Sequence, residues 1–193
     1  DSTSVNLYKL IVAALRRDPA RNVVVSEAGN FPTDLHIAEG AVAAVAGAEL
    51  RVVERDALAA ALGDDTALLL LTHVHYKTAE RFDMAAWTKA AHDAGALVCW
   101  DLSHSAGAVA VELNRCAADL AVGCGYKYLN GGPGAPAFIY VAKRWQERLH
   151  NPLSGWMGHA APFEFADGYE AAAGMKRWLT GTPSVLGLAA LES

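Results

Sequence analysis

The stretch Cys124-Gly125-Tyr126-Lys127-Tyr128-Leu129-Asn130-Gly131-Gly132-Pro133-Gly134-Ala135-Pro136 holds one lysine between two tyrosines, directly ahead of a loop rich in glycine and proline. Mostly apolar runs at residues 119–124 and 137–141 lie on either side of it, and each predicts a short buried strand. A lysine at the mouth of such a turn suits Schiff-base chemistry, because a buried lysine loses its proton readily. A partly exposed loop lysine, with only its stem on apolar surface, is the alternative interpretation.

A second motif lies upstream, in Val98-Cys99-Trp100-Asp101-Leu102-Ser103-His104-Ser105-Ala106-Gly107. Residues 96–100 predict a strand, so Asp101 lies at its carboxyl end and His104 follows in the next turn. An aspartate, a nearby histidine and a later lysine are what pyridoxal phosphate requires. The lysine forms the Schiff base, the carboxylate keeps the pyridine nitrogen protonated, and the protein fixes the orientation of the ring. Capping of a turn is the alternative role for the aspartate, and hydrogen bonding within the core is the alternative for the histidine.

Four motifs in the same order resemble the kynureninase family. They are Asn30-Phe31-Pro32-Thr33-Asp34, Trp100-Asp101-Leu102-Ser103-His104-Ser105, Gly125-Tyr126-Lys127-Tyr128-Leu129-Asn130-Gly131-Gly132-Pro133-Gly134 and Ser154-Gly155-Trp156-Met157-Gly158-His159. The resemblance runs from Asp1 to about Thr182. It implies a pyridoxal phosphate enzyme of the aspartate-aminotransferase-like class, fold type I.

The resemblance also implies the residues of the site. The implied cofactor contacts are Thr3, Ser4, Phe31, Asp34, Thr72, Asp101, His104, Tyr126, Lys127, Trp156 and Thr182, and the implied catalytic residues are Lys127, Asp101 and Tyr126. Phe31 matches the aromatic that stacks on the cofactor ring, although a hydrophobic staple is its alternative role. Tyr126 is a candidate acid–base group, and a hydrogen bond to the phosphate is its alternative role. Trp156 and Thr182 are expected to contact cofactor across a homodimer.

The first residues of the chain carry three small hydroxyls. Residues 4–17 have apolar side chains at helical spacing, so Ser2, Thr3 and Ser4 lie at the start of a predicted helix. Free N–H groups and hydroxyls at a helix start suit a phosphate, and ordinary N-capping explains the same spacing. The family resemblance matches Thr3 and Ser4 to the phosphate-binding positions.

Strands and helices alternate along the chain, which predicts a mostly parallel sheet with helices on both faces. Further strands are predicted at residues 22–26, 50–53 and 66–72, and further helices at 33–45, 56–62, 84–94 and 185–193. We expect residues 1–193 to form the large, cofactor-binding domain of a longer protein. The family would add a segment before Asp1 and a small domain after Ser193, and that small domain would supply an arginine for the substrate carboxylate.

The composition excludes several other classes of function. The net charge is −5 and no basic cluster is present, which argues against nucleic acid as a partner. No apolar run approaches the length of a membrane helix, and no signal peptide precedes the first helix. Cys99, Cys116 and Cys124 predict reduced thiols in a cytoplasmic protein. His73 and His75 lack a third ligand nearby, so no metal site is predicted.

The resemblance implies hydrolysis of L-kynurenine or 3-hydroxykynurenine to the corresponding anthranilate and L-alanine, in tryptophan catabolism, the kynurenine pathway and NAD biosynthesis. Another fold type I enzyme, such as a cysteine desulfurase or an aminotransferase, is the main alternative. Desulfurases need a reactive cysteine on an exposed loop, whereas all three cysteines here lie in strand or helix contexts. An inactive domain that kept the fold is the third hypothesis, and intact Asp101, His104 and Lys127 argue against it.

Overall fold

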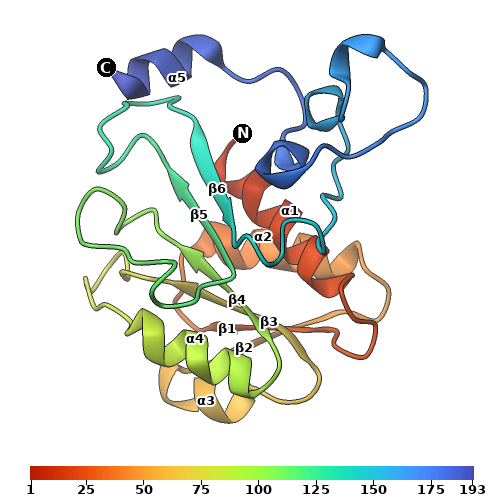
Figure 1. Ribbon diagram of the computed structural model, residues 1–193. Helices are drawn as coiled ribbons and strands as arrows, with labels where there is room; N and C mark the ends of the chain where they lie inside the picture. Colours follow the sequence, from red (N-terminus) through yellow and green to blue (C-terminus); the bar gives the residue numbers. More distant parts are fainter.

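Six strands form one sheet in the order β2-β1-β3-β4-β5-β6 (Figure 1). The computed structural model describes residues 1–193. The strands are β1 Val23–Glu27, β2 Glu49–Val53, β3 Thr66–Thr72, β4 Leu97–Asp101, β5 Leu120–Cys124 and β6 Ala137–Val141. The first five run parallel, and β6 pairs with β5 in the antiparallel direction. The predicted α/β class with a mostly parallel sheet is therefore confirmed.

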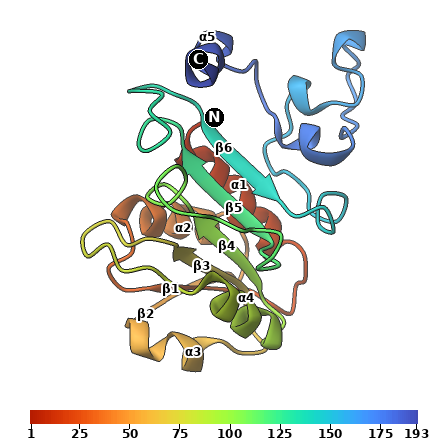
Figure 2. The same cartoon turned by 60° about the vertical axis from the view of Figure 1, so that its left-hand side comes forward.

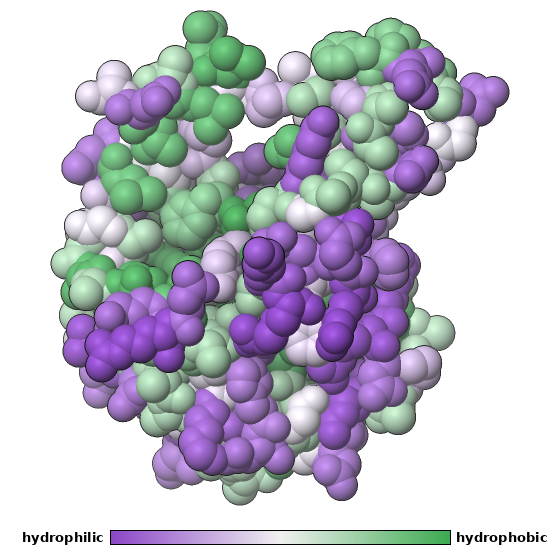
Figure 3. All heavy atoms as spheres, in the orientation of Figure 1, coloured by the Kyte–Doolittle hydropathy of each residue, from purple (hydrophilic) through white to green (hydrophobic).

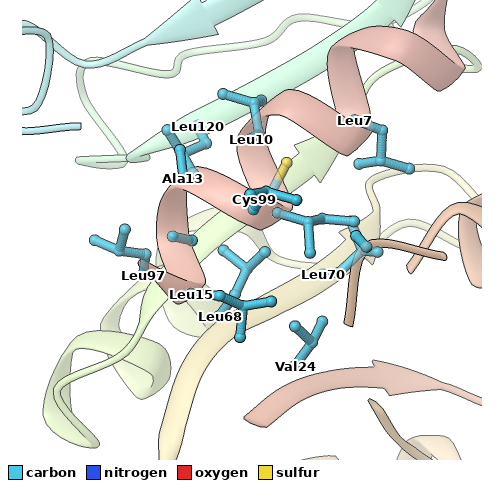
Figure 4. Close-up of a cluster of buried hydrophobic side chains, with 14 of the residues drawn as sticks. Leu7, Leu10, Ala13, Leu15, Val24, Leu68, Leu70, Leu97, Cys99 and Leu120 are labelled. Atoms are coloured by element: carbon cyan, nitrogen blue, oxygen red, sulfur yellow. The ribbon is translucent and has the colours of Figure 1, made fainter. Parts of the chain in front are cut away.

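Helices cover both faces of this sheet (Figures 1 and 2). On one face lie α1 Thr3–Leu15 and α2 Pro32–Ala43; on the other lie α3 Leu58–Ala61, preceded by a 3₁₀ turn at Arg55–Ala57, and α4 Met84–Asp93. Alternate residues of β3 enter the two cores, since Leu68 and Leu70 face α1 while Leu69 and Leu71 face α4. The continuous apolar run of β3 is thus what a parallel strand covered on both faces requires. Figure 4 shows the core beneath α1.

The C-terminal part of the chain is built from loops and short turns. Three 3₁₀ helices, Trp156–Gly158, Pro162–Glu164 and Gly174–Trp178, precede α5 Val185–Glu192. The Trp178 side chain is buried in the core on the α1 face of the sheet, together with residues of α1. Leu191 of α5 packs against the glycine-rich loop after β5, where a Cβ atom on Gly131 would lie 2.7 Å from it. The outer side of α5 is apolar and exposed, and Leu186 is 87% exposed (Figure 3).

The parallel strands deliver the predicted motifs to one edge of the sheet. Thr72 ends β3, Asp101 ends β4, and Lys127 follows β5 by three residues. The N-terminus reaches the same edge, because the Ala137 N–H at the start of β6 donates to the Asp1 carbonyl oxygen at 2.9 Å. Open α/β sheets bind their ligands beyond the carboxyl ends of the strands.

No helix in the structure has the length and apolar character that crossing a membrane requires.

A buried carboxylate stabilises the opposite edge of the sheet. Asp119 Oδ2 accepts from His92 Nε2 at 2.8 Å and from the Val98 N–H at 3.0 Å. Its Oδ1 accepts from Arg144 Nη2 at 2.7 Å and from Trp145 Nε1 at 2.6 Å. One side chain therefore joins α4, β4 and the segment after β6 at the start of β5.

We expect Asp119→Ala to lower the free energy of unfolding by about 3 kcal/mol or more, because it removes a buried acceptor of four hydrogen bonds and leaves the buried Val98 N–H unpaired. Urea unfolding followed by tryptophan fluorescence measures this change. The matched control is Glu112→Ala, which removes an exposed pair with Arg115 and should cost less than about 0.5 kcal/mol. Equal stability of the two variants would show that Asp119 is not a stabilising centre.

Candidate active site

Two buried carboxyl groups lie at the carboxyl edge of the sheet. Asp34 in the first turn of α2 and Asp101 at the end of β4 are each only 2% exposed. Burial, the charge of Asp101 and the hydrogen bond between the two side chains raise the pKa of Asp34 to about 9. Asp34 is therefore protonated near pH 7 and hydrogen-bonds to Asp101 as a neutral acid. The Ser103 N–H donates to Asp101 Oδ1 at 2.8 Å, which orients that carboxylate.

A small polar network holds Asp34 in place. Thr72 Oγ1 lies 2.5 Å from Asn30 Oδ1 and 3.4 Å from Asp34 Oδ2. Asn30 Nδ2 in turn donates to Ser26 Oγ at 3.1 Å. Asn30 is a site residue that the sequence analysis did not single out, although it begins the Asn30–Asp34 motif. Thr72 is brought to Asp34, as the family resemblance implied for residues of one site.

Lys127 and His104 meet on the same side of the sheet edge. The Lys127 Nζ atom lies 3.1 Å from His104 Nε2 and 5.3 Å from the centre of the Phe31 ring. Burial and the charge of Lys127 lower the pKa of His104, so the imidazole is neutral near pH 7. Nε2 then accepts from the lysine and Nδ1 carries the proton. His104 Nδ1 is buried and has no hydrogen-bond partner, so it is free to serve a bound group.

Aromatic rings surround His104. The Phe31 ring lies edge-on to Tyr76 at 5.2 Å, and Tyr76 and Tyr128 each lie 6.4 Å from the imidazole. Tyr76 is a second residue that the sequence analysis missed. Its loop is held by His75, whose Nε2 lies 2.9 Å from the Gly29 carbonyl oxygen. No local signal in the sequence reveals this contact, because Gly29 and His75 belong to different strand-to-helix connections.

Four of the predicted contacts, Thr3, Ser4, Tyr126 and Thr182, line a cavity of ≈ 590 Å³. The other seven do not line it; Tyr126 connects it to Lys127, whose Nζ lies 5.7 Å from the centre of the Tyr126 ring. The Ser2 hydroxyl caps α1 by accepting from the Val5 N–H at 3.3 Å, which leaves the first N–H groups of the helix directed outward. Ser184, which directly precedes α5, also lines the cavity. The starts of two helices therefore meet there, and helix N-termini favour anions.

Trp156 lies apart from that cavity. It is 40% exposed and packs edge-on against Phe163 at 5.7 Å. The backbone beside it is fixed, because the Met157 N–H donates to the Thr180 carbonyl oxygen at 3.3 Å. Thr182 lines the cavity of its own chain. Contact of Trp156 and Thr182 with cofactor across a dimer stays a prediction.

The three cysteines, His73 and His75 lie in positions that serve the packing of the fold. Cys99 and Cys124 are buried and Cys116 is half-buried. Burial raises the pKa of Cys99 and of Cys116, which keeps both thiols protonated. His73 lies edge-on to Trp100 at 5.9 Å, in the core on the α4 face.

Comparison with known proteins identifies the family of the chain. The model of the family described as Aminotransferase class-V matches residues 8–193. Kynureninase of Deinococcus radiodurans is 52% identical over 193 residues, which is all of this chain and 47% of that protein. Kynureninase of Burkholderia mallei is 50% identical over 198 residues and 48% of its length. The chain thus spans about half the length of these curated relatives, and the resemblance to kynureninases is confirmed.

Solved structures share the fold at low sequence identity. A cysteine desulfurase from Thermococcus onnurineus NA1 matches 98% of this chain and 49% of its own, with a TM-score of 0.74 and 20% identity. The cysteine desulfurase CsdA from Escherichia coli matches 97% of this chain and 48% of its own, with a TM-score of 0.78 and 18% identity. These likenesses extend over the sheet, its helices and the C-terminal segment alike. Because the family model matches residues 8–193, the chain belongs to the aminotransferase class-V family.

Proposed function

We propose that residues 1–193 form the large, pyridoxal phosphate-binding domain of a kynureninase, which hydrolyses L-kynurenine or 3-hydroxykynurenine to the corresponding anthranilate and L-alanine. The observation that carries this proposal is the meeting of Lys127 with His104 beside Phe31. Tyr126, which lies 5.7 Å from Lys127 Nζ, connects this pair to the cavity that Thr3 and Ser4 line. Whole-chain identity of 52% to a kynureninase supports the substrate class.

The residues present fit the cofactor. Lys127 Nζ offers the amine for a covalent attachment, and Asp101 offers a buried carboxylate for the pyridine nitrogen. Phe31 supplies a ring face, and His104 Nδ1 is a buried donor that still needs an acceptor. The start of α1 at Thr3 and Ser4 suits the phosphate.

Bound pyridoxal phosphate supplies an electron sink for the negative charge that develops on the substrate carbon. Asp101 would hold the proton of the pyridine nitrogen, because a buried carboxylate stabilises a cation beside it. Lys127 Nζ, as a free amine beside His104 Nε2, would accept the proton from the substrate Cα. His104, as a neutral imidazole, orients that amine.

Hydrolysis at the side-chain ketone needs an acid–base group. We assign this role to Tyr126, which lines the cavity and adjoins Lys127. Burial raises the pKa of Tyr126, so its hydroxyl is a proton donor near pH 7. A hydrogen bond from the same hydroxyl to the phosphate is its second proposed role, because Thr3 and Ser4 line the same cavity.

A cysteine desulfurase or an aminotransferase is the alternative activity. A desulfurase needs an accessible thiolate, and none of the three cysteines in residues 1–193 offers one, since two are buried and the pKa of Cys116 is raised. On the strength of the identity to kynureninases, we place the protein in tryptophan catabolism, the kynurenine pathway and NAD biosynthesis, as a cytoplasmic enzyme. The exposed apolar side chains Trp156, Phe163, Phe165 and Leu186 support a homodimer in which Trp156 reaches the partner's site.

Borohydride reduction of the protein with bound cofactor tests the role of Lys127. We expect peptide mapping to place the pyridoxyl label on Lys127, and Lys127→Ala to carry no label. Lys77 is the rival amine, because its Nζ lies 5.4 Å from the Tyr76 ring at the same site. A label on Lys77 or on Lys143 would contradict the assignment.

Asp101→Asn tests the electron sink and the activity together. The full-length protein that contains residues 1–193 should release anthranilate from kynurenine, which its fluorescence reports. It should release no sulfide from cysteine. Asp101→Asn keeps the shape of the contact but loses its charge, so turnover should fall by about a hundredfold or more while some cofactor binding remains. The exposed Asp64→Asn is the control. Near-normal turnover of Asp101→Asn would refute this role.

Asp34→Asn tests the buried carboxyl pair in the cofactor-free protein. Asp34 ionises with a pKa of about 9 when folded, against a value of 3.8 for an ordinary aspartate. Between these values the folded protein holds one more proton than the unfolded chain, so the free energy of unfolding falls as the pH rises. The amide introduced by Asp34→Asn cannot titrate, so we expect urea unfolding of this variant to show a smaller fall from about pH 5 to about pH 8.

The control for that series is Asp93→Asn, which changes an exposed carboxylate paired with Lys89. Its pH profile should follow that of the unmodified protein. An unchanged slope in Asp34→Asn would mean that Asp34 is ionised at neutral pH.

A further inference from the structure

Asn30 lies in the middle of a chain of buried hydrogen bonds beside Asp34. It is 2% exposed, and its neighbours in this chain, Ser26 and Thr72, are buried as well. Ser26 Oγ donates to the Leu70 carbonyl oxygen at 2.9 Å, and Asn30 Nδ2 donates to Ser26 Oγ at 3.1 Å. The direction of these bonds is fixed, because a carbonyl oxygen can only accept and the hydroxyl of Ser26 has one proton to give.

The orientation of the Asn30 amide follows from the residue after it. The Phe31 N–H can only donate, and it lies 2.7 Å from Asn30 Oδ1. This atom is therefore the amide oxygen, and it accepts a second hydrogen bond from Thr72 Oγ1 at 2.5 Å. A hydroxyl carries a single proton, so the proton of Thr72 is committed to Asn30.

Asp34 receives no proton from Thr72 as a consequence. Its Oδ2 lies 3.4 Å from Thr72 Oγ1, and a hydrogen bond donated by that hydroxyl would lower the pKa of Asp34 by stabilising the ionised form. Burial raises the pKa of Asp34; of the charged groups that face it, Asp101 of β4 raises the pKa further and Lys127 after β5 lowers it. The direction of the Thr72 hydrogen bond therefore bears on the charge of the carboxyl pair.

We propose that Asn30 is a positioning residue, which holds the hydroxyl proton of Thr72 and so keeps Asp34 neutral and the negative charge of the carboxyl pair on Asp101. The inference rests on the proposed function where it concerns the cofactor, because Asp101 is the carboxylate that we place at the pyridine nitrogen. Two ionised carboxylates buried side by side would repel each other. Asn30 acts through Thr72 and needs no contact with cofactor or substrate.

An asparagine that serves only the packing of the fold makes a different prediction. Its loss would lower the stability of the protein but would leave the ionisation of Asp34 at the same pH. Loss of a residue that holds the Thr72 proton would free this proton for Asp34, which would then ionise at a lower pH. That effect should disappear when Thr72 has no hydroxyl.

Infrared spectroscopy of the full-length protein that contains residues 1–193, without added cofactor, tests this role. A neutral carboxyl group has a C=O stretching band that disappears on ionisation, and the band that is missing in Asp34→Asn belongs to Asp34. We expect this band to titrate at a pH of about 9 in the unmodified protein. In Asn30→Leu, which keeps the size of the side chain, the midpoint should fall by about one pH unit or more.

Three further variants serve as controls. Thr72→Val removes the hydroxyl at nearly constant shape, and Asn30→Leu combined with Thr72→Val has no hydroxyl proton to release. Both should titrate within about 0.3 pH units of the unmodified protein. Asn114→Leu changes an exposed asparagine that accepts from the Tyr140 hydroxyl at 2.9 Å, and it should leave the midpoint unchanged.

The role of Asn30 would be overturned by an unchanged midpoint in Asn30→Leu, or by an equal fall in the double variant. A rise of about one pH unit in Thr72→Val would also overturn it, because Thr72 would then donate to Asp34 in the unmodified protein. Thr72→Val decides the question alone if Asn30→Leu does not fold. The titration needs no cofactor, so failure of the unmodified protein to bind pyridoxal phosphate would overturn the proposed function and leave this result readable.

Discussion

A parallel sheet covered on both faces returns the chain to the same edge after every strand. This constraint brings together residues that are far apart in the sequence, because β1, β3, β4 and β5 all end at one edge. The side chains just beyond those ends are Asn30, Thr72, Asp101 and Lys127. These side chains lie close together because the strands run in the same direction. The helices that pack on both faces of the sheet, with an apolar core on each face, stabilise this arrangement.

Burial at this edge of the sheet determines the protonation of one side chain in each of two pairs. Asp34 and Asp101 are buried together, so one of them stays neutral. Burial and the nearby charge of Lys127 lower the pKa of His104, which keeps the imidazole neutral. The site therefore combines a carboxylate that stabilises a cation with a neutral imidazole that accepts from an amine. The carboxyl pair is shielded from water, so its interaction is strong, whereas Lys127 and His104 are half-buried.

The sequence predicted the framework well because local patterns carry that information. Strand β3 was expected at residues 66–72 and lies there, since an unbroken apolar run bounded by polar residues suits a parallel strand covered on both faces. Asp101 and Lys127 were likewise expected where strands end. Contacts between distant segments left no such signal. Tyr76 was missed for that reason, because its place depends on the contact of its loop with Gly29. The family resemblance named four residues that line the cavity, Thr3, Ser4, Tyr126 and Thr182, but no local pattern gave the ion pair between Lys9 and Asp1.

Lys9 of α1 is buried, and its Nζ donates to the Trp178 carbonyl oxygen at 3.1 Å. This hydrogen bond bears on the order of folding. Helix α1 leaves the ribosome before any strand of the sheet, yet one acceptor for its buried ammonium group is synthesised 169 residues later. The apolar face of α1 also stays partly uncovered until β5 and β6 are synthesised, since these strands complete the surface on which it packs. Contacts of such long sequence separation form slowly, because a large loop must close first. While the sheet is being synthesised, α1 therefore lacks part of its packing surface. The cavity is completed last, because residues 179–184 line it.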